Sequence, residues 1–134
     1  MNQVRVILNK LNKYTSSESD FHIMEVLANF FTIDVNGDIN YCMKRFNEKN
    51  DALFYVGGDW ASLEKDENGY VVMIDTTTWR IYEDKPIPEE MILRIKPDEL
   101  IKLLYKWEEL YARKVPEIMI IKDGDKFEMF EVKS

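Results

Sequence analysis

The sequence predicts an α+β fold, a mainly antiparallel meander sheet covered by a C-terminal amphipathic helix and by one or two N-terminal helices. Three observations predict this class. Short β-branched and aromatic runs alternate with glycine-containing turns, apolar residues recur at helical spacing within residues 98–113, and two apolar runs flank a turn near the end. A chain of 134 residues with seven Phe, seven Tyr and three Trp has the size and core content of one domain, spanning 1–134.

The first segment fits two patterns. Val4, Ile7, Leu8 and Leu11 have the spacing of one helical face, which predicts a short helix over residues 3–13. Residues 4, 6 and 8 also alternate as apolar positions, so a strand stays open as the alternative.

A second helix is expected after the polar run 15–20, with Ser19 or Asp20 as its N-cap. Its inward residues are spaced three or four apart, namely Phe21, Met24, Leu27 and Phe31. Asn36-Gly37 then predicts a hairpin between residues 31–35 and 38–43, because both central positions of a type I′ turn need positive φ.

The middle of the chain reads as a meander. Strands are expected at 53–56, at 70–74 and, from its β-branched and aromatic residues, at 76–82. Gly57-Gly58 and the run 65–69 supply turns, and residues 83–88 form an exposed loop because proline cannot donate to a ladder.

The last third is a helix followed by a hairpin. Proline and acids at 97–99 mark the start of the helix at about 98–113. Its apolar face consists of Leu100, Leu103, Leu104, Trp107, Leu110 and Tyr111. After Val115-Pro116, a closing β-hairpin is expected over 117–132.

Charge and cysteine content restrict the partner and the compartment. Residues 51–90 hold ten acids and three bases, which accounts for the whole formal charge of −7. Such a region repels phosphate backbones and anionic membranes and attracts basic proteins, so we expect neither direct nucleic-acid nor membrane binding. Cys42 is the only cysteine, and no secretory signal or membrane-length apolar run is present, which favours a cytoplasmic protein.

The residue pattern predicts no catalytic constellation, no metal site and no cofactor. Asp34, Asn36 and Asp38 resemble the opening of a calcium loop, but Ile39 and Arg45 stand where that loop needs glycine and glutamate. His22 and Cys42 are too few for zinc, and both are expected to be structural.

Aromatic residues interleaved with acids are typical of protein-binding hot spots for a basic partner. We therefore expect the binding site in the acid-rich segment and its flanking turns. The candidate partner-binding residues are Asp59, Trp60, Glu64, Asp66, Glu67, Trp79, Tyr82, Glu83 and Asp84.

A small acidic domain with these features resembles the bacterial toxin immunity proteins in size and charge pattern. The resemblance implies a tight one-to-one complex with a cognate toxin, often a basic nuclease whose active site the inhibitor occludes. It implies a binding protein and not an enzyme.

Three other functions stay open. A phage-encoded inhibitor of a host defence nuclease would use the same acidic surface, and a scaffold or self-associating domain would show itself in its oligomeric state. A carboxylate-dependent hydrolase would need Mg²⁺ held by groups such as Asp34, Asp38 or Asp75.

Overall fold

The computed structural model describes residues 2–8, 13–16, 21–36, 38–47 and 61–133. The strands in this part of the chain are β1 (Asn2–Ile7), β2 (Lys13–Ser16), β3 (Ala61–Lys65), β4 (Val71–Asp75), β5 (Leu93–Ile95), β6 (Glu117–Asp123) and β7 (Lys126–Glu131). The helices are α1 (Phe21–Asn29), the π-helix η2 (Phe30–Val35), α2 (Asn40–Asn47), α3 (Thr76–Ile81), the 3-10 turn η3 (Glu89–Met91) and α4 (Pro97–Ala112). The fold is α+β, as the sequence predicts.

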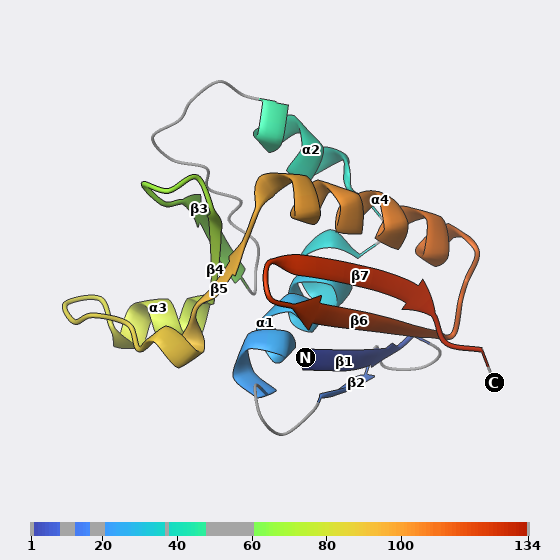
Figure 1. The fold of residues 1–134 in the computed structure, drawn as a ribbon, viewed down its shortest axis with the longest axis horizontal. Coiled ribbons are helices and arrows are strands. Elements are labelled where there is room, and N and C mark those ends of the chain that lie inside the picture. Colours follow the sequence, from blue (N-terminus) through green and yellow to red (C-terminus); the bar gives the residue numbers. More distant parts are fainter. Residues whose placement is uncertain (1, 9–12, 17–20, 37, 48–60, 134) are drawn as a thin grey trace.

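The strands form two antiparallel sheets, where the sequence suggested one meander. A four-stranded sheet has the order β2-β1-β6-β7, and a three-stranded sheet has the order β3-β4-β5. Helix α1 contacts β1 and β2 of the first sheet and β4 and β5 of the second, so it lies between them. Figure 1 shows α4 running beside β7, with α3 at the far end of the molecule from the four-stranded sheet.

One hydrophobic core joins these elements. Val4 and Val6 of β1 lie opposite Ile120 and Ile118 of β6, and all four side chains are buried. Helix α4 turns its predicted apolar face into this core, with Trp107 fully buried. None of the helices in the described ranges is long and apolar enough to cross a membrane.

The first segment is a strand and not the predicted helix. Buried Val4 and Val6 alternate with exposed Gln3 and Arg5, which is the period of a strand with one buried face. Pairing with β6 satisfies the main chain and selects the alternating pattern over the helical one.

The hairpin predicted around Asn36-Gly37 is wrong. Residues 30–35 are π-helical and residues 40–47 are α-helical, with Asn36 ending η2 at φ 52. Its N–H donates to the carbonyl of Phe31 at 2.8 Å. Asparagine tolerates the left-handed region at the end of a helix as well as in a hairpin turn, so the same residue served a different purpose.

The strand predicted at 76–82 is also wrong, because α3 occupies 76–81. Asp75 caps this helix: its Oδ1 accepts the Thr78 N–H at 2.7 Å, and its Oδ2 accepts the Thr78 hydroxyl at 2.9 Å. The strand at 70–74, the helix near 98–113 and the hairpin at 117–132 are confirmed. The strand predicted at 53–56 and the Gly57-Gly58 turn lie outside the described residues.

Candidate functional site

The three-stranded sheet has one core face and one outer face. Leu63, Met73 and Leu93 stand side by side across the strands and are buried on the core face. The alternate positions therefore form the outer face, where Glu64 is half-buried and Ile74 is buried. Helix α3 follows β4 directly and contacts β3 and β4, and its Trp79 lines one pocket with Glu64 and Ile74 of this outer face.

A pocket of about 560 Å³ lies on this outer face, and we call it the α3 pocket. The sheet and the segment preceding β5 contribute Glu64, Ile74 and Ile92. Helix α3, the turn after it and the following loop contribute Trp79, Tyr82, Glu83, Lys85 and Ile87. Three isoleucines, two aromatic rings, two carboxylates and one ammonium group thus surround a single hollow.

Four of the nine predicted contact residues line this pocket: Glu64, Trp79, Tyr82 and Glu83. Trp79 is 41% exposed, an unusual exposure for a tryptophan. Asp84 is exposed in the turn beside the pocket but does not line it. Asp59 and Trp60 lie outside the described residues, so their predicted role stays a prediction.

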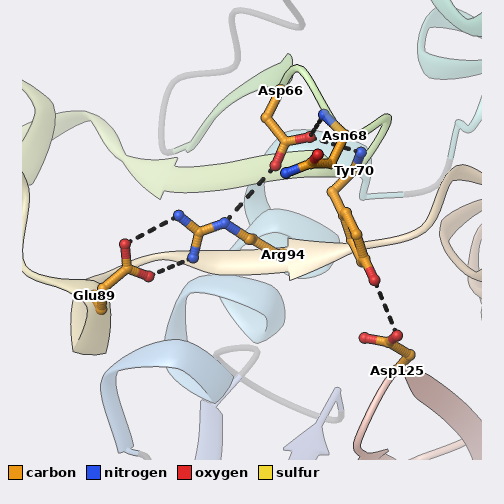
Figure 2. Close-up of polar contacts among 6 residues, drawn as sticks. All are labelled: Asp66, Asn68, Tyr70, Glu89, Arg94 and Asp125. Carbon is orange, nitrogen blue, oxygen red and sulfur yellow. Dashed lines mark hydrogen bonds and ion pairs between the residues drawn. The ribbon is translucent and has the colours of Figure 1, made fainter.

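Asp66 organises a turn. Its Oδ1 accepts the N–H groups of Asn68 and Tyr70, both at 2.9 Å, and Figure 2 shows these two bonds. Glu67 is exposed within the same β3–β4 turn. Neither residue lines the α3 pocket, so the structure separates this pair from the four that do.

Arg94 of β5 is held by two carboxylates, as Figure 2 shows. Its guanidinium makes a two-pronged contact with Glu89, and its Nε lies 3.8 Å from Oδ2 of Asp66. The hydrogen bonds from Arg94 hold the pKa of Glu89 below its ordinary value. Because Val72 pairs with both Glu64 and Arg94, these three residues form one row across the outer face of the sheet.

The sequence analysis missed the three isoleucines and Lys85 as pocket residues. A signal for one of them was present: the turn at 66–69 sets the register that pairs Ser62 with Ile74 and therefore places Ile74 on the face of Glu64. No comparable local signal identifies Ile87, Ile92 or Lys85, because the loop after α3 brings them to the pocket.

A second hollow of about 480 Å³ lies between α4 and β7. The exposed rings of Tyr105 and Phe130 line it together with two lysines and two glutamates. Both lysines are already paired on α4, Lys102 with Glu99 and Lys106 with Glu109. This hollow therefore presents balanced charge, in contrast to the α3 pocket.

The carboxylates considered for Mg²⁺ bind the protein's own main chain. Oδ2 of Asp34 accepts the N–H of Ala61 at 2.8 Å, Oδ1 of Asp38 accepts that of Asn40 at 2.9 Å, and Asp75 caps α3. Within the described ranges, no group of three or more His, Cys, Asp or Glu residues is placed to hold a metal ion.

His22 and Cys42 have separate surroundings. Nε2 of His22 lies 3.0 Å from Oδ2 of Asp75, a close contact without the alignment of a hydrogen bond. Cys42 is buried in α2, and burial together with Asp34 and Asp38 raises the pKa of its thiol to about 11. A thiol with that pKa holds almost no thiolate at neutral pH, so it is a poor nucleophile.

Comparison of the chain with protein-family models, with curated protein sequences and with solved structures found no match in any of the three.

Proposed function

We propose that this protein binds a basic protein partner through the α3 pocket and inhibits it, as an immunity protein inhibits a nuclease-type toxin. The observation that carries the proposal is the convergence of Glu64, Trp79, Tyr82 and Glu83 on one hollow. These residues come from β3, from α3 and from the turn after it, so local sequence does not bring them together.

The composition of the pocket supports a protein partner. Trp79 and Tyr82 supply the large, rigid contact area that interface hot spots commonly use. Glu64 and Glu83 supply the negative potential that would steer a basic surface into register. A standard interface of about 1,600 Å² around this pocket would give a stable complex.

Charge supports a basic partner more specifically. The acid-rich segment 51–90 contains the pocket residues from Glu64 to Ile87, and it carries all of the net negative charge. A nuclease that binds a phosphate backbone presents the complementary sign at its active site. Occlusion of that site by carboxylates is the simplest inhibitory mechanism for such a pair.

The test is inhibition by stoichiometric titration. The product of the neighbouring gene is purified, its nuclease activity is measured, and the protein is added up to and beyond one equivalent. We expect nuclease activity to reach zero at a one-to-one molar ratio of this protein to the nuclease. The association rate of the two proteins should fall as the salt concentration is raised. Absence of binding and of inhibition would contradict the immunity function.

The site is tested with matched aromatic variants. Trp79→Ala combined with Tyr82→Ala should weaken the complex by at least about 30-fold, as expected for hot-spot residues. Tyr105→Ala removes an even more exposed ring, on α4, and should leave affinity unchanged. Equal effects of the two changes would place the interface elsewhere.

A nuclease encoded away from this gene, in a host defence system, would be the target if the protein is phage-encoded. Titration against such a nuclease distinguishes the two inhibitors by partner, because both would use the same carboxylates.

A further inference from the structure

We infer that the α3 pocket receives an arginine side chain of the bound partner. This inference rests on the proposed function, because it names the partner group that the pocket binds. It is carried by the lining of the pocket, by two carboxylates that form no ion pair among the described residues, and by an arginine that the same sheet face already holds.

The lining matches the two ends of an arginine. Ile74, Ile87 and Ile92 offer an apolar surface for the methylene stem, while Trp79 and Tyr82 offer rings on which a planar guanidinium stacks. A volume of about 560 Å³ falls within the range of about 300–1,000 Å³ typical of small-ligand sites, so one long side chain fits.

Lys85 lines the pocket, but among the described residues neither pocket carboxylate is ion-paired. In the described part of the chain, no ion pair or hydrogen bond joins the side chain of Glu64 or Glu83 to a basic residue. Glu64 is nevertheless half-buried beside buried Ile74, where water solvates it incompletely. A guanidinium would satisfy both charge and hydrogen-bonding capacity there.

Arg94, on the same face of the sheet, is an example of a guanidinium held by two carboxylates. Glu89 and Asp66 grip its guanidinium, and it shares a row with Glu64 across the intervening Val72. The outer face thus holds one paired arginine. Glu64 of the same row and Glu83 of the turn after α3 line a pocket with room for a second.

Lys85 and Glu64 carry opposite charges, so their removal should change the affinity for arginine in opposite directions. The ammonium group of Lys85 lines the pocket and repels an incoming cation. Its removal should therefore strengthen the binding of arginine, whereas removal of Glu64 should weaken it. A pocket that binds by apolar contact alone would respond to neither charge.

The experiment is an NMR titration of the intact protein with N-acetyl-L-arginine amide, followed at the indole N–H of Trp79. Its neutral isostere, N-acetyl-L-citrulline amide, is the control ligand. We expect saturable shifts with the arginine amide at a Kd of about 1 mM and no saturation with the citrulline amide. Equal binding of the two ligands, or binding of neither, overturns the inference.

Charge variants complete the test. Glu64→Gln should weaken the arginine amide by about 3-fold and Lys85→Gln should tighten it by about 3-fold, as expected for partly exposed charge pairs. Glu108→Gln makes the same charge change on the exposed face of α4, away from the pocket, and should have no effect. A Lys85→Gln variant that binds equally or more weakly contradicts the inference.

The results distinguish a failure of the arginine inference from a failure of the proposed function. If the arginine amide does not bind but the Trp79 and Tyr82 changes still abolish inhibition, the partner uses the pocket without an arginine. If the amide binds as expected but inhibition ignores those changes, the pocket is an arginine site and the proposed interface is wrong.

Discussion

Cys42 shows at the scale of one residue how surroundings determine reactivity. The side chain is 3% exposed in α2, and burial is the largest cause of its raised pKa. The sequence predicts Cys42 in a hairpin strand, and this is wrong because the residue lies in α2. The prediction that the thiol is structural does not depend on the type of element, because it rests on burial alone.

We expect Cys42 to resist thiol reagents in the native protein. At neutral pH the thiolate fraction is very small and access is blocked, so labelling should follow the rate of unfolding. One thiol should react at once in denaturant. Rapid stoichiometric labelling of the native protein would show that α2 opens freely.

The raised pKa of Cys42 also has a consequence for stability at alkaline pH. Since the folded-state pKa of about 11 lies above the ordinary thiol pKa of 9.0, the favourable contribution is complete below pH 9.0 and is lost as pH rises towards 11. The free energy of unfolding should fall by up to about 3 kcal/mol across that window. A Cys42→Ala variant should lose this part of the slope, which denaturant titrations at several pH values would measure.

Asp75 is the residue that determines the start of α3. Asp75→Ala removes both cap bonds to Thr78 and should lower the free energy of unfolding by about 1–2 kcal/mol in urea. Asp75→Asn keeps an acceptor oxygen and should recover most of this loss. If asparagine were as damaging as alanine, the charge facing His22 would be the stabilising feature, and not the cap. Asp84→Ala, on the exposed turn, is the neutral control.

At the scale of elements, local patterns predicted what local physics determines. The helix α4 was predictable because Leu100, Leu103, Leu104, Trp107 and Leu110 repeat at helical spacing, and all five are buried. The β6–β7 hairpin was predictable because Gly124, at φ 60, allows the tight turn between its strands.

Two predictions, the hairpin around Asn36-Gly37 and the strand at 76–82, were wrong. In each of these segments, contacts with distant residues or a single helix cap determine the structure. Trp107 donates its indole N–H to the carbonyl of Asn36, and the rings of Phe31 and Trp107 lie 5.2 Å apart. These contacts favour a helix ending at Asn36 over a hairpin, and the indole hydrogen bond joins residues 71 positions apart. At 76–81, the β-branched residues predicted a strand, but the Asp75 cap favours a helix.

The same reasoning explains the candidate site. Composition gave nine candidate residues in an acid-rich, aromatic segment, and four of them line the α3 pocket, namely Glu64, Trp79, Tyr82 and Glu83. Their convergence depends on α3 folding back on the sheet, which a strand at 76–82 would not have done. Residue type was therefore predictable, and the geometry was not.

The junction of η2 and α4 gives a prediction at this scale. The hydroxyl of Tyr111 donates to Oδ1 of Asn36 at 2.7 Å, and Asn36 has positive φ. Tyr111→Phe and Asn36→Gly should each cost about 0.5–1.5 kcal/mol through the same lost hydrogen bond. Asn36→Ala should cost about 1–2 kcal/mol more than Asn36→Gly, because alanine is strained in the left-handed region. Denaturant midpoints measure all three.

A double variant shows whether the two residues act together. Tyr111→Phe with Asn36→Gly should lose little more than either change alone, because both remove one interaction. Fully additive losses would mean that the hydrogen bond between them does not contribute to stability.

At the scale of the whole molecule, polar contacts tie the two sheets together outside the core. The hydroxyl of Tyr70, just before β4, donates to Oδ2 of Asp125 in the β6–β7 turn at 3.0 Å, and Figure 2 shows this bond. Lys96, between β5 and α4, lies 3.6 Å from the same oxygen. Asp125 therefore links the sheet that carries the α3 pocket to the four-stranded sheet.

The hydrogen bond between Tyr70 and Asp125 should be measurable through the pKa of Tyr70. The hydrogen bond to the Asp125 carboxylate is the largest cause that raises the pKa of Tyr70 above its ordinary value. Asp125→Asn should lower that pKa towards the ordinary range, because amide oxygen carries no charge to oppose the phenolate. Asp123→Asn, on the other side of the turn, should leave it unchanged. NMR titration of the tyrosine ring carbon that bears the hydroxyl follows each phenol separately. The hydrogen bond to Asp125 raises the pKa of Tyr70 more than desolvation does. A pKa that does not respond to Asp125→Asn would contradict this hydrogen bond as a link between the two sheets.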